Sequence, residues 1–249
     1  MTKTNFYLQT IVLFSTLAFS NSSFSPLPVE AEAESLQSIP LEWSNSQSSP
    51  DFSGDGRPKR TAGGASRSQC LAENDVPLTA IVPDTSVALT AAKSPTFWFY
   101  LPNSLTSKHS VEFVLKDDRD KYIYKTELAG EKVSSGIIGL QLPATITLNA
   151  KHDYHWYFLV HCQARNKFVY VNGSVRRIET PNLDISNSLP QEQLNFYASQ
   201  GLWYDAMTNV AEQMSANPQN PTNQDNWATL LQSVELNELI HKPVVSLEK

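Results

Sequence analysis

Basic charge is in short supply in this sequence. Its 249 residues include 19 lysines and arginines against 25 aspartates and glutamates, which gives a net charge of -6. A protein that binds nucleic acid needs a surplus of basic side chains to displace counterions from the phosphates. The composition therefore argues against a nucleic-acid-binding protein, whereas 41% of hydrophobic residues is ordinary for a globular one.

Recognised catalytic motifs are also missing. The chain contains no G-x-S-x-G, no H-E-x-x-H and no pair of carboxylates at a catalytic spacing. An enzyme whose residues converge only in three dimensions carries no such motif, so a hydrolase of that kind is our least favoured function. We predict that the protein is not an enzyme and has no cofactor.

Long apolar runs are limited to the N-terminus. Lys3 precedes an apolar stretch over residues 6–19, and Ala31 and Ala33 follow with the spacing of an A-x-A cleavage site. This pattern predicts a secretory signal peptide over residues 1–33 and a location in the periplasm or cell envelope. An uncleaved anchor is the alternative. No other segment is long and apolar enough to predict a membrane span.

Cysteine is scarce, with only Cys70 and Cys162. In an exported protein a single pair is most simply a disulfide, which we predict here. The two cysteines are 92 positions apart. A bridge of that length stabilises a fold by about 4 to 5 kcal/mol in the chain-entropy model, less any strain or residual structure in the denatured state.

Residues 34–69 are rich in Ser, Pro, Gly and Asn without periodicity, which predicts a disordered linker. Its end gathers basic residues around two glycines: Arg57, Lys59, Arg60 and Arg67, with Gly63 and Gly64. A phosphate loop would need a preceding apolar strand and a Lys followed by Ser or Thr, and both are missing. We expect a basic linker; the alternative is an arm that binds an anion or a partner through Arg57, Arg60 and Arg67.

Residues 70–180 predict an antiparallel, immunoglobulin-like β-sandwich. Aromatic and β-branched runs are separated by Pro, Gly, Asn or Asp turns, and they occupy residues 78–82, 87–90, 96–101, 110–116, 121–128, 136–142, 154–162 and 167–171. Between two of these runs, KDDRDK at 116–121 resembles a calcium loop but lacks the required glycine and distant glutamate. A charged hairpin turn is the better interpretation.

The stretch HDYHWYFLVHC, residues 152–162, invites a metal-site interpretation. As a strand it alternates, so Trp156 and Cys162 belong to the core face together with Tyr154, Phe158 and Val160. His155 and His161 share the other face but stand about 20 Å apart at about 3.3 Å per residue. Metal–ligand bonds of about 2 Å cannot bridge that distance, so we predict no metal site.

The run PTFWFYLP, residues 95–102, is apolar on both faces and predicts a strand that is covered on each side. Core packing is then the role of most of its rings. The alternative exposes Trp98 and Tyr100 as a stacking platform for sugar rings or for the apolar surface of a partner. The sequence does not separate the two.

Residues 181–249 change to a helical period and predict helix, turn, helix, a Pro- and Asn-rich break, and helix. A glycine, a tryptophan, small residues and a proline follow the spacing of a tetratricopeptide repeat: Gly201, Trp203, Ala206, Val210, Met214 and Pro218. Such units need about three copies to bury a continuous core, and at most one fits here. The hairpin must therefore pack on the sandwich or on another chain.

Several motifs in order give the chain a family resemblance: GRPKRTAGGASRSQC at 56–70, PTFWFY at 95–100, YHWYFLVHC at 154–162, and Gly201 with WYDA at 203–206. The chain resembles a cyanobacterial family of exported proteins known only as a domain of unknown function, over about residues 56–240. Where that family is expected to have Gly or Asn in a turn, this chain has Asp118, Arg119 and Asp120, so no role of that turn is carried over. The resemblance supplies no catalytic residue.

Two binding functions follow as expectations. The first is a periplasmic or envelope module that binds a protein partner, with Trp203 and Tyr204 exposed on the helical hairpin. The second is a module that binds carbohydrate or cell wall, with an envelope polysaccharide stacked on Trp98, Tyr100 or Tyr157.

Overall fold

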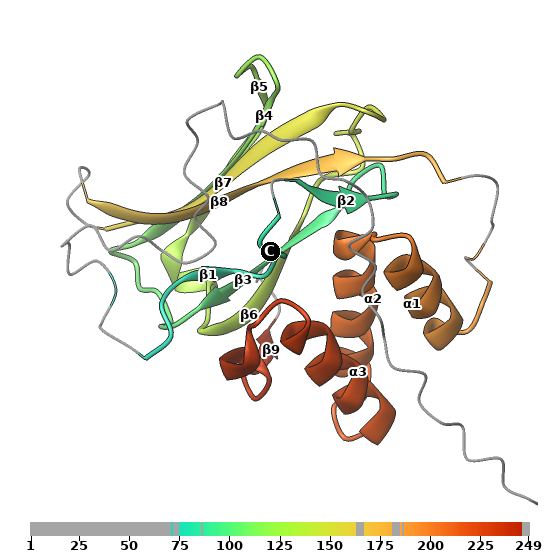
Figure 1. The fold of residues 1–249 in the computed structure, drawn as a ribbon. Helices are drawn as coiled ribbons and strands as arrows, with labels where there is room; N and C mark the ends of the chain where they lie inside the picture. The colour runs from blue at the N-terminus through green and yellow to red at the C-terminus, as the bar shows by residue number, and fades with distance from the viewer. Residues whose placement is uncertain are drawn as a thin grey trace, which may run out of the picture. The chain divides into compact units, whose positions relative to one another are not determined.

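The computed structural model describes residues 71, 75–85, 87–162, 167–180, 185 and 187–245. The predicted signal peptide, the linker, Cys70 and the arginines Arg57, Arg60 and Arg67 lie outside this part. The strands are β1 Thr79–Ala80, β2 Ala88–Thr90, β3 Thr96–Leu101, β4 Ser110–Asp117, β5 Tyr122–Ala129, β6 Gly136–Gln141, β7 Asp153–His161, β8 Phe168–Arg177 and β9 Val244–Val245. The helices are α1 Pro190–Ser199, α2 Trp203–Ala216 and α3 Pro221–Gln232, with short 3-10 turns at Gly130–Lys132 and Asn237–Leu239 (Figure 1).

Each of the eight predicted strand runs contains a strand, and the helix–turn–helix–break–helix order is confirmed. Gly201 has a φ of 66° at the turn between α1 and α2, a conformation that favours glycine. Asn220 caps α3 because its side chain accepts hydrogen bonds from the backbone N–H groups of Thr222 and Asn223. The predicted hairpin turn at 116–121 is also confirmed, since it joins β4 to β5.

The strands form two mixed sheets. The four-stranded sheet has the order β1-β3-β6-β9, and the five-stranded sheet has the order β2-β8-β7-β4-β5. The pairs β2–β8 and β6–β9 are parallel. The prediction of an antiparallel arrangement is wrong at these two edges, because β2 and β9 reach their neighbours from distant parts of the chain and no hairpin sets their direction.

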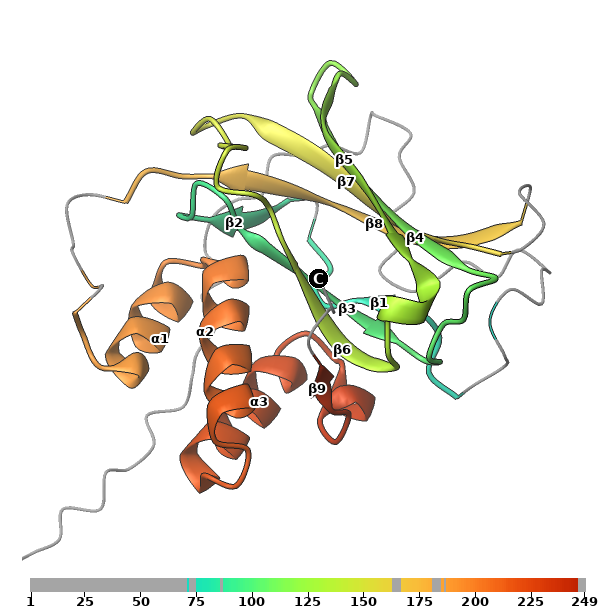
Figure 2. The same ribbon diagram turned by 180° about the vertical axis from the view of Figure 1, so that it is seen from behind.

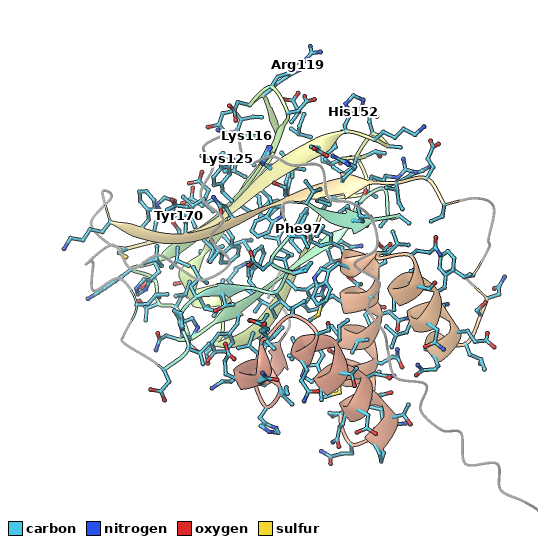
Figure 3. All side chains as sticks on the ribbon, in the orientation of Figure 1. Phe97, Lys116, Arg119, Lys125, His152 and Tyr170 are labelled. Atoms are coloured by element: carbon cyan, nitrogen blue, oxygen red, sulfur yellow. The ribbon has the colours of Figure 1, made fainter. Side chains whose placement is uncertain are left out.

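Aromatic rings fill the space between the two sheets. Phe97 of β3 lies with its ring centroid 5.0 Å from that of Phe113 in β4, and Phe99 stacks on Phe158 of β7 at 4.1 Å. Figure 3 shows Phe97 among these packed side chains. The described strands therefore form a sandwich-like pair of sheets; the immunoglobulin-like and tetratricopeptide-like assignments stay predictions.

The predicted alternation is confirmed within β7, whereas Cys162, which was predicted on the core face, follows the strand and is only partly buried. Tyr154, Trp156, Phe158 and Val160 are buried, and the residues between them are partly exposed. His155 and His161 are on that second face, where each contacts a different neighbour. Among the described residues, no group of three or more His, Cys, Asp or Glu side chains is placed to hold a metal ion.

Strand β3 is covered on both faces, as predicted. Trp98 and Tyr100 point away from the five-stranded sheet, yet they are only 8% and 6% exposed. The Trp98 indole N–H donates to the Thr208 hydroxyl of α2 at 3.1 Å, and the Lys242 ammonium lies 5.6 Å from the Tyr100 ring centroid. The alternative of an exposed stacking platform is therefore wrong, because α2 and the C-terminal segment cover this side.

The helices and both sheets share one hydrophobic core. Helix α2 contacts β2, β3 and β9, so the helical hairpin packs on the sheets, which is one of the two alternatives predicted for it. No helix in the described part of the chain is long and apolar enough to cross a membrane.

Candidate functional site

The first turn of α2 holds the helix against both sheets. Trp203 and Tyr204 are 0% and 1% exposed, so the prediction that they form an exposed surface is wrong. The Trp203 indole N–H donates to the Ile81 carbonyl at 2.9 Å. The Tyr204 hydroxyl accepts from the Trp156 indole N–H at 2.8 Å and donates to the Ser174 carbonyl at 3.3 Å. Burial raises the pKa of Tyr204 far above its ordinary value.

Asp205 continues the same docking. Its carboxylate accepts from the backbone N–H groups of Ala91 at 3.0 Å and of Ala92 at 3.2 Å, just after β2. Burial raises the pKa of Asp205, although these hydrogen bonds and one from Thr90 lower it in part. Three consecutive side chains thus bind three different segments of the sheets. The WYDA motif builds the fold and leaves no ring for a partner.

A polar cleft of about 220 Å³ lies beside α2. Hydroxyl, amide and carboxyl groups line it, including Thr96, Gln193, Tyr197, Asp205 and Glu212. Burial raises the pKa of Tyr197, and the charges of Asp205 and Glu212 raise it further. The lining has no histidine, cysteine or basic residue, and the volume is below the range of about 300 to 1,000 Å³ common for ligand pockets. We assign no chemistry to this cleft.

The outer face of the five-stranded sheet is a better candidate. It consists of the side chains that alternate with the core residues of β4, β7 and β8, together with outward residues of β5: Glu112, Val114 and Lys116; Asp153, His155, Tyr157, Leu159 and His161; Phe168, Tyr170, Asn172, Ser174 and Arg176; Tyr122, Lys125 and Glu127. In the described part of the chain, the three helices lie on the other side of the molecule (Figure 2). This face is therefore not covered by them.

Ion pairs organise the polar part of the outer face. Glu112 accepts from Lys125 at 2.7 Å and lies 2.8 Å from the Nε2 atom of His161. Burial raises the pKa of Glu112, but the hydrogen bonds from Lys125 and His161 outweigh it and hold the pKa below its ordinary value. Arg176 binds Asp153 through two hydrogen bonds, of 2.5 and 2.8 Å. These two hydrogen bonds hold the Asp153 and Arg176 side chains together where β7 begins and β8 ends.

Aromatic rings occupy the rest of the outer face. The Lys116 ammonium lies 4.9 Å from the Tyr122 ring centroid and 5.7 Å from that of Tyr157. The ring centroids of Phe168 and Tyr170 are 6.0 Å apart, and the angle between the two ring planes is 48°. Phe168 is 39% and Tyr122 61% exposed, which is high for large apolar side chains. Figure 3 labels Lys116, Lys125 and Tyr170 on these strands.

Tyr157 is the one residue of this face that the sequence predicted to bind a ligand. Phe168 and Tyr170 were within a predicted strand, and their alternation with buried Val171 was the available indication. The predicted run ends at residue 171, whereas β8 continues through Asn172, Gly173 and Ser174 to Arg177.

The chain matches a known protein family. A family model described as Domain of Unknown Function (DUF928) matches residues 62–244. The chain belongs to this family. The DUF928 match includes both sheets and all three described helices, so the helical region is part of the same family domain as the strands. No curated protein matches the chain. The predicted family of unknown function is thus confirmed, and its exported, cyanobacterial character stays a prediction.

Proposed function

We propose that this DUF928 protein is an exported interaction module of the periplasm or cell envelope, which binds a protein partner through the outer face of the five-stranded sheet. One observation carries the proposal: this face bears exposed aromatic rings and is left open by the described helices, whereas helix α2 covers the outward side of the other sheet at Trp98. Aromatic side chains are enriched at protein interfaces relative to the rest of the surface.

Export is supported by the N-terminal pattern of residues 1–33, and a disulfide between the two cysteines is what we expect of an exported protein. Within the described residues no cysteine is a free thiol. This agrees with the proposed Cys70–Cys162 disulfide, whose first cysteine lies outside the described part. A basic arm through Arg57, Arg60 and Arg67 lies there too and stays a prediction.

The geometry of the rings favours a protein over a polysaccharide. Phe168 is tilted by 48° against Tyr170 and by 53° against His161, so the three rings offer no flat common plane. The Lys116 ammonium already lies over Tyr157, the one ring of the predicted sugar platform that is on an open face. A partner with apolar side chains for Phe168 and Tyr170 and a carboxylate for Lys116 matches this chemistry.

Site-specific photo-crosslinking in envelope extract tests the proposal. A photoreactive phenylalanine analogue at position 168 should capture a protein, and the same analogue at Leu189, which is 67% exposed on the helical side, should not. The double variant Phe168→Ser with Tyr170→Ser should lose that protein in a pull-down while Leu189→Ser retains it. Equal recovery by all forms, or retention on purified peptidoglycan that depends on the two rings, would contradict the proposal.

A further inference from the structure

Strand β5 is a long free edge. It spans eight residues, Tyr122–Ala129, and pairs with β4 on one side only among the described strands. The other sheet-edge strands are short: β2 has three residues, and β1 and β9 have two each. Proteins usually keep edge strands short or distorted because their unpaired N–H and C=O groups bind further strands. The register of the β4–β5 pair shifts between Leu115 and Lys116, where Ile123 of β5 has no opposite residue, so β5 is regular from Tyr124 to Ala129.

We propose that β5 pairs antiparallel with β5 of a second copy of the chain, with Thr126 opposite itself at the two-fold axis. A strand that pairs with its own copy about a two-fold axis must place one residue opposite itself. Centring the pair on Thr126 puts Lys125 opposite Glu127 of the second copy, twice. Centring it on Lys125 or on Glu127 would put like charges directly opposite each other, which destabilises a strand pair. Among the possible centres within β5, only Thr126 places the strand's own opposite charges, Lys125 and Glu127, opposite each other.

Glu127 would gain an ion-pair partner, Lys125 of the second copy, in this register. Across the β4–β5 pair it stands directly opposite Glu112, which already binds Lys125 and His161. No ion pair involves Glu127 among the described residues. The Lys125 side chain is 54% exposed and so has room to reach a second carboxylate. In the proposed dimer, Lys125 of the second copy relieves the repulsion between the two glutamates of the first.

The other face of β5 supplies apolar contact. Tyr124 and Leu128 are partly buried and pack against the edge of the core, and the Tyr124 ring centroid is 6.4 Å from that of Phe113. In the Thr126-centred register, Tyr124 is opposite Leu128 of the second copy. Cross-strand aromatic–aliphatic pairs of this kind stabilise sheets. One strand pair buries less surface than a standard interface, so we expect a dimer that dissociates on dilution.

Lys125 and Glu127 also belong to the outer face, but this inference concerns the free edge of β5. Its measurement is the oligomeric state and not the capture of a partner, so its failure and the failure of the proposed function are distinguishable. Sedimentation velocity of the purified chain over a concentration series should show monomer and dimer in exchange. Lys125→Glu alone and Glu127→Lys alone should each be monomeric, since each places like charges opposite each other twice. A mixture of these two variants should form a heterodimer, because every 125–127 pair is then of opposite charge.

Lys108→Glu and Glu131→Lys are matched controls, with the same charge changes on exposed residues outside the strand, and should dimerise like the wild type. Far-UV circular dichroism confirms that each variant is folded. A wild type that is monomeric throughout the series would overturn the inference. Dimers that persist in both single variants, or a mixture that stays monomeric, would overturn the register.

Discussion

Two tryptophans of the core each lie opposite a glycine on the neighbouring strand. Trp98 pairs with Gly139 and Trp156 pairs with Gly173. A Cβ atom at position 139 would lie 2.9 Å from the Trp98 ring, and one at position 173 would lie 2.4 Å from the Trp156 ring. The missing side chains therefore make the space in which the two indoles lie flat against the sheet.

We expect Gly173→Ala to lower the free energy of unfolding by about 1 to 3 kcal/mol, because the new methyl group overpacks a fully buried ring. Urea denaturation measures the change. Trp156→Phe provides the control, since a smaller ring leaves room for the methyl group. The cost of Gly173→Ala should therefore be smaller in the Trp156→Phe background, and an equal cost in both backgrounds would contradict a clash with the indole.

The Tyr204 hydroxyl is the hydrogen-bond acceptor for the Trp156 indole N–H at 2.8 Å. We expect Tyr204→Phe to lower the free energy of unfolding by about 1 to 3 kcal/mol, because a buried donor loses its partner. Tyr197→Phe removes a hydroxyl from a half-buried ring of α1 and should change stability much less. Denaturant unfolding of both variants compares them. Equal losses would show that the buried hydrogen bond is not the cause.

At the scale of elements, α2 is the part that joins the two sheets to the helices. Its first turn contacts the segment after β1 through Trp203, strands β7 and β8 through Tyr204, and the segment after β2 through Asp205. Because the first turn of α2 is buried against the sheets, the helix and the sheets stabilise each other. The charge on Asp205 makes this docking dependent on pH.

Burial raises the pKa of Asp205 above its ordinary value of 3.8, so the folded chain holds this proton more tightly than the unfolded chain does. The contribution of this pKa shift to the free energy of unfolding is therefore fully present below pH 3.8, and it is lost as pH rises through the pKa of Asp205 in the folded chain. Asp205→Asn removes the titration. We therefore expect the stability of the wild type relative to Asp205→Asn to fall as pH rises from acid toward neutral, as measured by urea denaturation. A difference that grows with pH would contradict it.

For Glu112→Gln we expect the dependence of stability on pH to have the opposite sign to that for Asp205→Asn. Burial raises the pKa of Glu112, but hydrogen bonds from Lys125 and His161 hold it below its ordinary value of 4.5. The contribution of the ionised Glu112 carboxylate to the free energy of unfolding is thus present above pH 4.5, and it is lost as pH falls through the pKa of Glu112 in the folded chain. The wild type should lose stability relative to Glu112→Gln toward acid pH, so the two variants should change in opposite directions over one pH series.

Alternation and turn residues predicted the strands well, because period two depends on the chain alone. They did not predict what covers each face. Trp203 and Tyr204 resembled an exposed pair, and only the packing of α2 on the sheets shows that they are buried. The predicted run at 167–171 ended too early, although the strand continues with Gly173 against the ring of Trp156 across the strand pair. Both errors arise from contacts between segments far apart in the sequence.

The same limit applies to the candidate site. Single residues of the outer face, such as Tyr157 and His161, were assigned to the correct side of β7 from the sequence. Their grouping with Lys116 and Phe168 depends on the order of strands in the sheet. Strand order was not available from periodicity, since an antiparallel sandwich admits several orders with the same alternation.

At the scale of the whole molecule, the proposed disulfide would join Cys70, ahead of β1 in the sequence, to the end of β7. Cys162 directly follows β7, and its backbone N–H donates to the Lys167 carbonyl at 3.0 Å, at the start of the connection to β8. A bond to Cys70 would tie the segment ahead of β1 to this end of the five-stranded sheet. It closes a loop of 92 positions, which restricts the unfolded chain far more than the folded one.

We therefore expect a reductant to lower the free energy of unfolding of the oxidised protein by up to about 4 to 5 kcal/mol. Intact-mass measurement after alkylation should show no free thiol before reduction and two after it. Cys162→Ser should start at the lower stability and should not respond to the reductant, which separates loss of the bridge from any general effect of the reagent. Exported protein that carries two alkylated thiols without reduction would contradict the disulfide, and the start of the folded domain would then be held by packing alone.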